Sequence, residues 1–315
     1  MLAVTIVDGA LEWREHPDPE PGTGEVVVAV RAAGLNSADR LQVAGLYPAP
    51  PGSPPDIPGL EVAGEVLAVG PGATRFTVGD RVMAVVGGGG QAERLVVPER
   101  HLLPVPDGIA WEAAGGFPEA FSTAFDALFT QCGLQVGDRV CVHGAAGGVG
   151  IAGVQLAAAA GAHVVATVRA EERRAAVAEL GAHEVVAPEA FVDHGPFDIV
   201  LELVGAPNLA DDLRALATGG RVTVIGVGAG AKAEVNLLEL MGKRARVLGS
   251  TLRARSFEEK AMVARAVEAH VLPLLAAGTV RVPVDATFAM AEAAAAYEHF
   301  AAGGKLGKVV LLSPA

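Results

Sequence analysis

A glycine-rich turn between an apolar segment and an alanine-rich segment is the feature that most limits how this chain can fold. Residues 140–150 read Val-Cys-Val-His-Gly-Ala-Ala-Gly-Gly-Val-Gly, and residues 151–160 are rich in alanine. We expect a strand over 140–143, a tight turn, and then a helix as far as Gly161. Glycines in such a turn let the backbone and the helix N-terminus approach a dinucleotide pyrophosphate. The same pattern also arises from packing alone, so this interpretation depends on the rest of the chain.

Helices and strands alternate on both sides of this turn. Further helices are expected near 119–132, 171–180 and 209–216, and further strands over 164–168, 198–202, 221–225 and 246–250. Strands separated by helices of this length predict a parallel sheet that is wound on both faces. Residues 118–253 are therefore expected to form an α/β domain with a doubly wound parallel Rossmann sheet.

The first 117 residues are rich in strands and turns instead. Strands are expected over 26–31, over 61–70 and in 76–85 after a turn at Gly79. A short helix over 38–43 is expected to precede an irregular loop, because prolines stand at 48, 50, 51, 54, 55 and 58. After a helix near 257–277, strand-like residues 309–312 should return to this region. Residues 1–117 with 254–315 thus predict a second, strand-rich domain.

Composition and charge exclude several classes of protein. The 315 residues are 51% hydrophobic, and no apolar run approaches the roughly 20 residues of a membrane-spanning helix. The N-terminus lacks a basic segment and a cleavage site, so we expect a cytoplasmic protein. A net charge of −12 argues against nucleic acid as a partner. Cys132 and Cys141 suit neither a disulfide framework nor a zinc site, and neither has a histidine at the spacing of a catalytic pair.

The end of the 164–168 strand bears on the choice of cofactor. An Asp or Glu at that position usually receives the ribose hydroxyls of NAD. Here the strand is followed by Arg169 and Arg173, whose guanidinium groups suit the 2′-phosphate of NADP. Alternatively, these arginines pair with Glu171 and Glu172 and only solubilise the next helix.

Metal-binding residues are sparse. The strand-rich region contains no cysteine, and its His16 and His101 stand alone and are expected at the surface. We therefore predict no metal site, and redox chemistry in this chain would proceed without a metal ion.

Several short runs together resemble a known family. They are Ala-Ala-Gly-Leu-Asn-Ser-Ala-Asp-Arg at 32–40, Gly-Leu-Tyr-Pro at 45–48, Pro-Gly-Leu-Glu-Val-Ala-Gly at 58–64, the run at 117–125, the glycine turn, and Gly-Gly-Lys-Leu-Gly-Lys at 303–308. In order and spacing they resemble the zinc-independent, zeta-crystallin-like quinone oxidoreductases of the medium-chain dehydrogenase/reductase superfamily. The resemblance covers nearly the whole chain. Zinc-dependent relatives carry a histidine where this sequence has Leu60.

The resemblance implies a fold and a set of site residues. The strand-rich part would be a GroES-like catalytic domain, and NADPH would bind with its nicotinamide in the cleft between the two domains. Asn36 and Tyr47 match active-site positions, Thr123 matches a threonine that contacts the cofactor, and Arg173 stands where relatives often carry a lysine for the 2′-phosphate. Ala187 replaces a tyrosine of relatives, which weakens the expectation for adenosine recognition.

The chemistry of hydride transfer agrees with these residues. Hydride addition to a conjugated carbonyl generates an enolate or hydroquinone anion, so the site needs positioning and hydrogen-bond donors. The amide of Asn36 and the phenol of Tyr47 are such donors. Alternatively, Asn36 caps the helix that begins near Ser37, and Tyr47 covers the proline loop.

The remaining cofactor contacts are expected at strand ends and in the C-terminal tail. The candidates are Ala145, Gly147, Gly148, Val149, Gly150, Leu203, Val204, Gly226, Val227, Leu306 and Lys308. For the glycines the alternative is turn geometry alone, and for Lys308 it is an ordinary exposed lysine.

We therefore expect an NADPH-dependent quinone oxidoreductase that uses no metal and takes a small quinone or related conjugated carbonyl. An NADPH-dependent enoyl or alkene reductase is the enzymatic alternative. A crystallin-like structural or RNA-binding protein that retains the fold is the alternative from another class, although the net charge argues against RNA. By analogy with relatives, residues 246–251 are expected to join two copies into a homodimer.

Overall fold

A computed structural model describes residues 1–314 and divides the chain into two compact units. Unit 1 comprises Met1–Ser122 and Leu252–Ala315, and unit 2 comprises Thr123–Thr251. These limits lie a few residues from the boundaries expected at 117/118 and 253/254. Helix α3 (Pro118–Phe125) contains the first crossing of the chain from one unit to the other.

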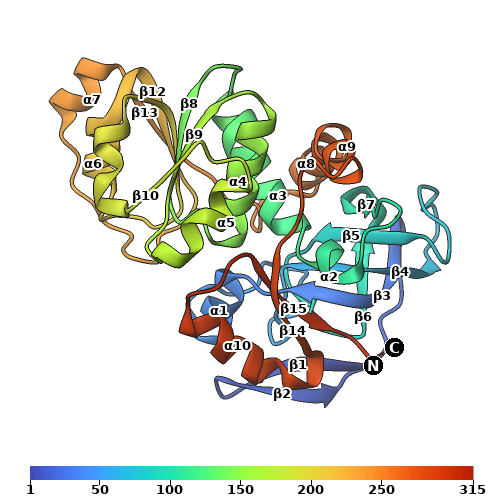
Figure 1. Cartoon of the computed structure of the whole chain (residues 1–315). Coiled ribbons are helices and arrows are strands. Elements are labelled where there is room, and N and C mark those ends of the chain that lie inside the picture. The colour runs from blue at the N-terminus through green and yellow to red at the C-terminus, as the bar shows by residue number, and fades with distance from the viewer. Residues whose placement is uncertain (315) are drawn as a thin grey trace. The chain divides into compact units, whose positions relative to one another are not determined.

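Unit 2 is built on a six-stranded, entirely parallel sheet with the order β10-β9-β8-β11-β12-β13 (Figure 1). Its strands are β8 (Arg139–Val142), β9 (His163–Thr167), β10 (Glu184–Val186), β11 (Phe197–Glu202), β12 (Leu216–Val224) and β13 (Arg246–Gly249). This order confirms the doubly wound α/β fold. The strand order reverses between the neighbours β8 and β11, where ligands of such sheets bind beyond the carboxyl ends of the strands.

Helices cover both faces of this sheet. Helices α4 (Gly148–Ala159) and α5 (Arg174–Ala178) lie on one face, and α6 (Leu209–Ala215) and α7 (Leu237–Lys243) lie on the other side (Figure 1). Two expected helices are shorter than the pattern suggested. The one expected over 119–132 changes to a π-helical segment at Asp126–Gln131, and the one expected over 171–180 begins with the 3₁₀ turn Glu171–Arg173. Strand β10 was not predicted from the sequence. It has only three residues, all half-buried, so its hydrophobic pattern has no recognisable period.

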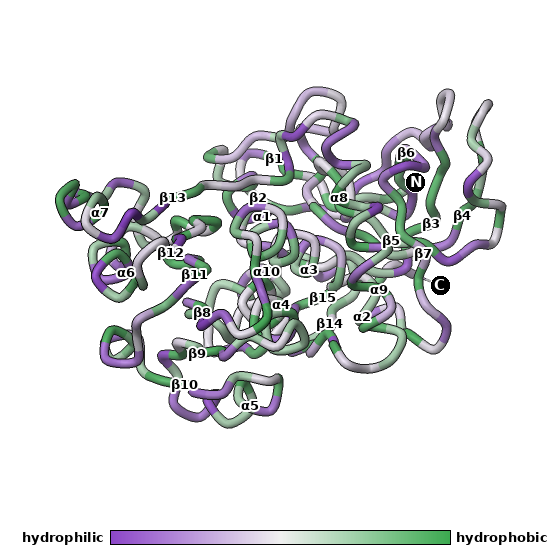
Figure 2. Tube along the Cα trace, turned by 90° about the horizontal axis from the view of Figure 1, so that it is seen from above, coloured by the Kyte–Doolittle hydropathy of each residue, from purple (hydrophilic) through white to green (hydrophobic). Residues whose placement is uncertain are grey.

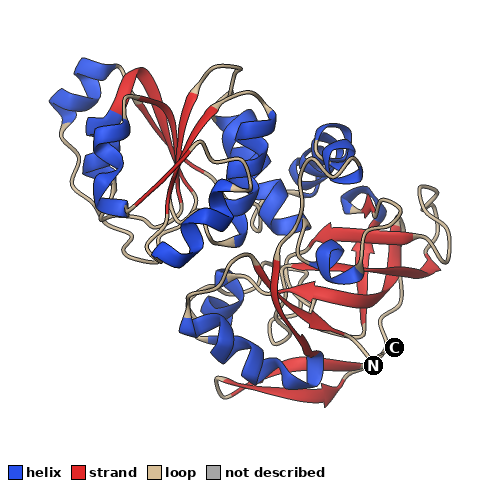
Figure 3. Cartoon of the chain, viewed as in Figure 1, coloured by secondary structure: helices blue, strands red, loops and turns tan. Residues whose placement is uncertain are grey.

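Unit 1 contains a seven-stranded sheet and a two-stranded hairpin (Figure 3). The main path is β14-β15-β3-β4-β5-β7, and β6 pairs with β3. The strands are β1 (Leu2–Val7), β2 (Ala10–Glu15), β3 (Glu25–Gly34), β4 (Glu61–Val69), β5 (Arg81–Val85), β6 (Arg94–Pro98), β7 (Leu103–Pro104), β14 (Val284–Ala289) and β15 (Lys308–Leu312). Strand β15 pairs antiparallel with β3, with Val310 opposite Gly34, which confirms that the tail returns to this unit.

The helices of unit 1 are short except near the C-terminus. They are α1 (Ser37–Val43), α2 (Trp111–Gly115), α8 (Phe257–His270), α9 (Leu272–Ala276) and α10 (Ala293–Ala302), with 3₁₀ turns at Glu99–His101 and Met290–Glu292. The single helix expected over 257–277 is therefore two helices. The break falls at Val271, two residues before Pro273, which has no N–H for a helical hydrogen bond.

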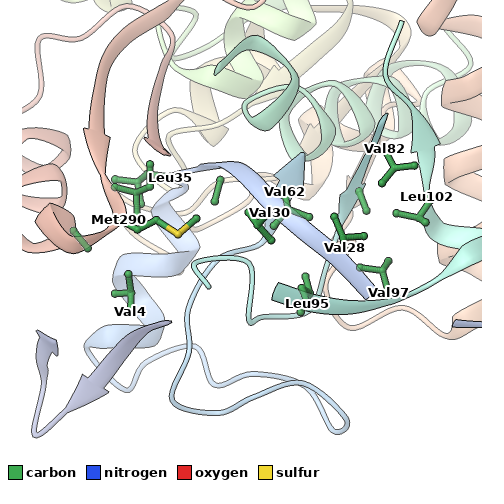
Figure 4. Close-up of a cluster of buried hydrophobic side chains, with 14 of the residues drawn as sticks. Val4, Val28, Val30, Leu35, Val62, Val82, Leu95, Val97, Leu102 and Met290 are labelled. Carbon is green, nitrogen blue, oxygen red and sulfur yellow. The ribbon is translucent and has the colours of Figure 1, made fainter. Parts of the chain in front are cut away.

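The core of unit 1 is made by the inward faces of its strands. Val28 and Val30 of β3 pack with Val62 of β4 and Val82 of β5, and all four are at most 2% exposed (Figure 4). Hydrophobic and hydrophilic segments alternate along the chain trace in Figure 2. This packing fixes the ends of β3, β4 and β15, from which the candidate site projects.

Candidate active site

Asn36 lies where strand β3 gives way to helix α1. It occupies the N-cap position, and its backbone N–H donates to the Asp39 carboxylate at 2.8 Å. Its side chain does not cap the helix and lies against two other residues. The Nδ2 atom donates to Glu61 Oε1 at 3.0 Å, and Oδ1 accepts from Lys308 Nζ at 2.8 Å. Asn36 therefore stands at the N-cap position, as the alternative interpretation expected, but its side chain binds Glu61 and Lys308 instead of capping the helix.

Lys308 is a buried cation at the start of strand β15. The residue is 4% exposed, and its Nζ lies 2.5 Å from Glu61 Oε1 and donates to the Leu35 carbonyl at 2.9 Å. With the bond to Asn36, all three ammonium hydrogens have acceptors. The alternative that Lys308 is an ordinary exposed lysine is wrong, because this ion pair compensates its charge inside the unit.

Glu61 connects this cluster to helix α3. The residue is fully buried, and its Oε2 accepts the backbone N–H of Glu119 at 2.9 Å. Asn36 Nδ2 also donates to the Gly34 carbonyl, at 3.3 Å. Both amide hydrogens of Asn36 thus have protein acceptors, and a substrate oxygen would have to replace one of them. The longer bond, to Gly34, is the one more readily exchanged.

Tyr47 lies in the proline loop with its ring against Arg253. The Arg253 guanidinium carbon is 4.9 Å from the ring centroid, and Nη1 donates to the Tyr47 carbonyl at 2.9 Å. Arg253 also donates to the carbonyl of Gly87 at 2.8 Å and to the side chain of Gln42. Among residues 1–314, the Tyr47 hydroxyl has no protein hydrogen-bond partner, so it is free to donate to a ligand.

Arg253 is a site residue that the sequence analysis missed. It is only 5% exposed, and burial lowers the pKa of its guanidinium. It is separated from Tyr47 by 206 positions in the sequence, and no local pattern connects the two. The pairing arises only because Arg253 lies at the start of the segment, Leu252–Ala315, that brings the chain back to unit 1.

Asp39 adds a titratable group to the same cluster. It is fully buried, and its carboxylate accepts the backbone N–H groups of Asn36 and Gly59. Burial raises its pKa to about 7, against those two hydrogen bonds and the charge of Lys308, which lower it. Gly59 has φ +111°, and a Cβ there would lie 2.5 Å from the backbone nitrogen of Gln91. Only glycine therefore brings this N–H to Asp39.

Two glycines of the turn in unit 2 differ in their surroundings. Gly150 has no room for a side chain, whereas Gly147 has room for an added Cβ. A Cβ on Gly150 would lie 2.4 Å from the Gly144 carbonyl oxygen and 2.6 Å from Ala145 Cα. A Cβ on Gly147, the N-cap of α4, would meet only the Gly144 oxygen, at 3.4 Å. Packing alone explains Gly150, and it does not explain Gly147.

The predicted strand-end contacts lie together in unit 2. A Cβ on Gly226 would lie 2.3 Å from the Leu203 carbonyl oxygen, and one on Gly144 would lie 3.7 Å from side-chain atoms of Leu203 and Val204. The glycine turn, residues 203–204 and residue 226 thus adjoin at the ends of β8, β11 and β12. Val227, next along the chain, is 49% exposed.

The other predicted cofactor residues are spread over both units. Arg169 is exposed and Arg173 is half-buried, and both follow strand β9. Thr123 is buried at the start of unit 2, and Ala187 follows β10. Leu306 belongs to unit 1, where its N–H donates to Asp285 at 3.1 Å. Their roles stay predictions.

The donor atoms around Asn36 are an amide, carboxylates and an ammonium group. Leu60, where the resemblance to zinc-dependent relatives would place a histidine, is 2% exposed. His16 and His101, expected at the surface, are both half-buried; each uses Nε2 for a hydrogen bond, to Thr5 and to the Phe257 carbonyl respectively. Within residues 1–314, the one group with metal-ligand spacing is His143, Glu202 and Asp212, in unit 2.

The cysteines offer no nucleophile. Cys141 lies within β8 and Cys132 follows the π-helical segment, and both are buried thiols. Burial raises the pKa of each, to about 11 for Cys132, so both stay protonated at neutral pH. In addition, none of the helices in residues 1–314 has the length and apolarity to cross a membrane.

Family models and curated relatives match the sequences of both units. A family model described as zinc-binding dehydrogenase matches residues 148–268, and one described as alcohol dehydrogenase GroES-like domain matches residues 22–107. The chain is 32% identical to a quinone oxidoreductase of Rattus norvegicus, over 93% of this chain and 91% of the relative. It is 34% identical to a quinone oxidoreductase of Pseudomonas aeruginosa, over 96% and 95%.

Solved structures share the whole fold. An NAD-dependent alcohol dehydrogenase superposes with a TM-score of 0.85 at 28% identity, over 99% of each chain. An alcohol dehydrogenase superfamily protein from Novosphingobium aromaticivorans gives a TM-score of 0.86 at 29% identity, again over 99% of each chain. A GroES-like fold for unit 1 and a Rossmann-like fold for unit 2 follow from these matches.

Proposed function

The chain belongs to the quinone oxidoreductase family of medium-chain dehydrogenases/reductases, an oxidoreductase family that uses nicotinamide cofactors, and we propose that it reduces quinones with NADPH without a metal ion. The free hydroxyl of Tyr47, beside the buried Arg253, is the observation that carries this proposal. It supplies a hydrogen-bond donor for the oxyanion that hydride transfer creates.

The proposed dinucleotide site lies in unit 2. The backbone from Ala145 to Gly150 would hold the pyrophosphate at the N-terminus of α4, and Leu203, Val204, Gly226 and Val227 would flank the nicotinamide side. When bound, the dihydronicotinamide supplies the hydride. Thr123, Leu306 and Lys308 are proposed as further contacts, with Lys308 acting through its neighbours because its ammonium group is fully bonded.

Unit 1 would orient the substrate and stabilise negative charge. Tyr47 donates its phenolic proton in a hydrogen bond to the developing oxyanion, and Arg253 holds the ring in place through stacking and through the Tyr47 carbonyl. Asn36 exchanges its bond to Gly34 for a second donation to the substrate. The donors assigned to the substrate are the amide of Asn36 and the phenol of Tyr47, and Leu60 offers no metal ligand. Stabilisation of the negative charge is therefore assigned to hydrogen bonds instead of zinc.

A turnover panel tests the function. NADPH and NADH are each supplied with quinones and with enones, and oxidation of the cofactor is followed by absorbance. We expect turnover of quinones with NADPH. Turnover of enones alone would indicate the alkene reductase, and no saturable binding of either nucleotide would remove the enzymatic assignment.

Tyr47→Phe is expected to lower kcat for quinones by about 10- to 100-fold, because removal of an oxyanion donor costs roughly that or more. The ring that stacks on Arg253 remains, so the Kd for NADPH should not change. The matched control is Tyr297→Phe, which removes the buried hydroxyl that donates to Gln91 at 3.1 Å and should leave kcat unchanged. Full turnover by Tyr47→Phe would contradict the proposed role.

Preference for NADPH is assigned to the arginines after β9. Replacing both Arg169 and Arg173 by alanine is expected to weaken NADPH binding by about 10- to 100-fold, since charge-assisted hydrogen bonds contribute roughly 1.5–3 kcal/mol. NADH binding should change far less. Arg214→Ala removes one exposed arginine that pairs with Asp211, and it controls for the loss of a positive charge elsewhere on unit 2. Fluorescence titration measures each Kd, and an equal loss for both nucleotides would refute the assignment.

A homodimer through β13 is proposed from two exposed features of unit 2. Strand β13 is an edge of the sheet, and helix α7 before it exposes Leu238 by 79% and Met241 by 69%. Open strand edges and apolar patches are typical of interfaces. Leu238→Asp with Met241→Asp should give a monomer by light scattering, whereas Met262→Asp, on exposed α8, should not. A wild-type monomer would refute the dimer.

A further inference from the structure

Three titratable residues are enclosed in unit 2 at the ends of its central strands. His143 follows β8, Glu202 ends β11 and Asp212 lies in α6, and each is at most 1% exposed. None has a part in the chemistry proposed above. Charged groups are rarely fully buried unless they are paired or hydrogen-bonded.

His143 connects helix α6 to strand β9, whose residue Thr167 contacts the start of the glycine turn. One ring nitrogen, Nε2, lies 2.8 Å from Asp212 Oδ1, and the other, Nδ1, lies 3.0 Å from the Thr167 hydroxyl. The carbonyl of Thr167 accepts the backbone N–H of Ala145 at 3.2 Å. Phe191 packs edge-on against the imidazole at 4.5 Å and fixes the ring plane. A short chain of bonds therefore joins Asp212 to the first residue of the proposed pyrophosphate site.

The Glu202 carboxylate holds the turn that follows β11. Its Oε1 accepts the N–H groups of Val204 and Gly205, the latter at 2.7 Å, and its Oε2 accepts from the side chain of Asn208 at 3.0 Å. Both oxygens are occupied by N–H donors. A metal ion would have to displace these bonds, so the cluster is better suited to hold a proton than a cation.

The backbone of Glu202 holds the turn after the neighbouring strand. Its carbonyl accepts the N–H groups of Ile225 at 2.9 Å and Gly226 at 3.2 Å. One residue therefore fixes both turns assigned to the nicotinamide side, the first through its side chain and the second through its main chain.

Few titratable groups lie close enough to His143 to influence its charge. His143 Nε2 is 4.0 Å from Glu202 Oε2 and 3.8 Å from the Cys141 sulfur, and Asp212 Oδ2 is buried with no partner among residues 1–314. Thr167 and Phe191, from the other elements packed on the ring, carry no charge. Burial raises the pKa of Asp212 to about 6. Burial opposes a charged imidazole, but the hydrogen bond to the Asp212 carboxylate and the charge of that carboxylate raise the pKa of His143 above its usual value.

We propose that His143, Asp212 and Glu202 form a positioning device for the dinucleotide, in which a proton on the imidazole balances the carboxylates and keeps Glu202 oriented to hold residues 203–205. The inference rests on the proposed function only in the identity of the ligand. Loss of the proton leaves two carboxylates beside a neutral ring in a dry interior. Glu202 then loosens its turn, and nucleotide affinity falls as pH rises.

The test replaces the imidazole by a group that donates but does not titrate. In His143→Gln, we expect the Kd for NADPH to rise about tenfold at pH 7 and to lose its dependence on pH above neutrality, whereas the wild-type Kd increases as the imidazole loses its proton. His163→Gln, which removes a half-exposed histidine paired with Glu184 in the same sheet, should keep the wild-type pH profile. If His143→Gln does not fold, Asp212→Asn replaces it. This variant removes the carboxylate that stabilises the imidazolium, so the same loss of NADPH affinity is expected.

Hydrogen–deuterium exchange of the ligand-free protein supplies a second readout. Residues 203–208 should exchange faster in His143→Gln than in the wild type or in His163→Gln. Unchanged exchange, or a pH profile parallel to that of the wild type, would overturn the proposal even if the melting temperature falls. If wild-type protein binds no nucleotide, the proposed function fails, and the exchange experiment still decides whether the cluster positions the turn.

Discussion

Lys308→Met is expected to lower the free energy of unfolding by about 3–5 kcal/mol, because breaking a buried ion pair leaves an uncompensated charge. The charge left behind is Glu61, which is fully buried and would keep only the Asn36 amide and the Glu119 N–H as donors. The loss should appear in urea-induced unfolding monitored by circular dichroism.

Two variants show whether the pair or only the bulk of Lys308 matters. Adding Glu61→Gln removes the orphaned charge, so the double variant should recover part of the loss. Lys305→Met removes a half-buried lysine that contacts the Phe300 ring and carbonyl without an ion pair, and it should cost less than about 1 kcal/mol. If Lys308→Met were no less stable than Lys305→Met, the ion pair between Lys308 and Glu61 would not stabilise the buried cluster as expected.

Gly147→Val is expected to weaken NADPH binding by about 100-fold or more, which corresponds to roughly 2.7 kcal/mol, with little change in melting temperature. Gly147 has φ −79° and ψ 166°, which valine adopts readily, and the nearest atom to an added Cβ is 3.4 Å away. The protein itself leaves room for an added Cβ at this position. Any loss of affinity therefore reports on the ligand that approaches this backbone.

Gly150 provides the matched comparison. Gly150→Ala places a Cβ 2.4 Å from the Gly144 oxygen, so the turn must shift, and overpacking of this kind costs about 1–3 kcal/mol. We expect this variant to lose melting temperature as well as affinity. Titration of NADPH fluorescence and thermal unfolding separate the two effects. A Gly147→Val variant that binds NADPH like the wild type would exclude the pyrophosphate from this turn.

The local pattern of the sequence was enough to predict most of the fold. The glycine turn, the period of the helices and the strands around it predicted the doubly wound sheet of unit 2, because hydrophobic spacing and turn residues act over a few positions. The pattern failed where no period exists, at β10, and where backbone geometry changes within one helical stretch, at 126–131 and at Val271.

Only part of the candidate site could be predicted from the sequence. Asn36 and Tyr47 came from motifs, and the glycines came from the chemistry of phosphate binding. The contacts of Arg253 with Tyr47, 206 positions apart, were not visible, and neither was the role of Glu202 in holding two turns.

The sequence by itself determined most of the helices and strands, the glycine turn that opens α4 and the leucine at position 60. Only the tertiary structure decided that Lys308 is buried against Glu61, that the Asn36 amide is already hydrogen-bonded, and that His143 shares its environment with two carboxylates. The physical reason is that a charged side chain looks the same in sequence whether it is solvated or buried. Its state depends on a partner that the fold brings to it from far along the chain.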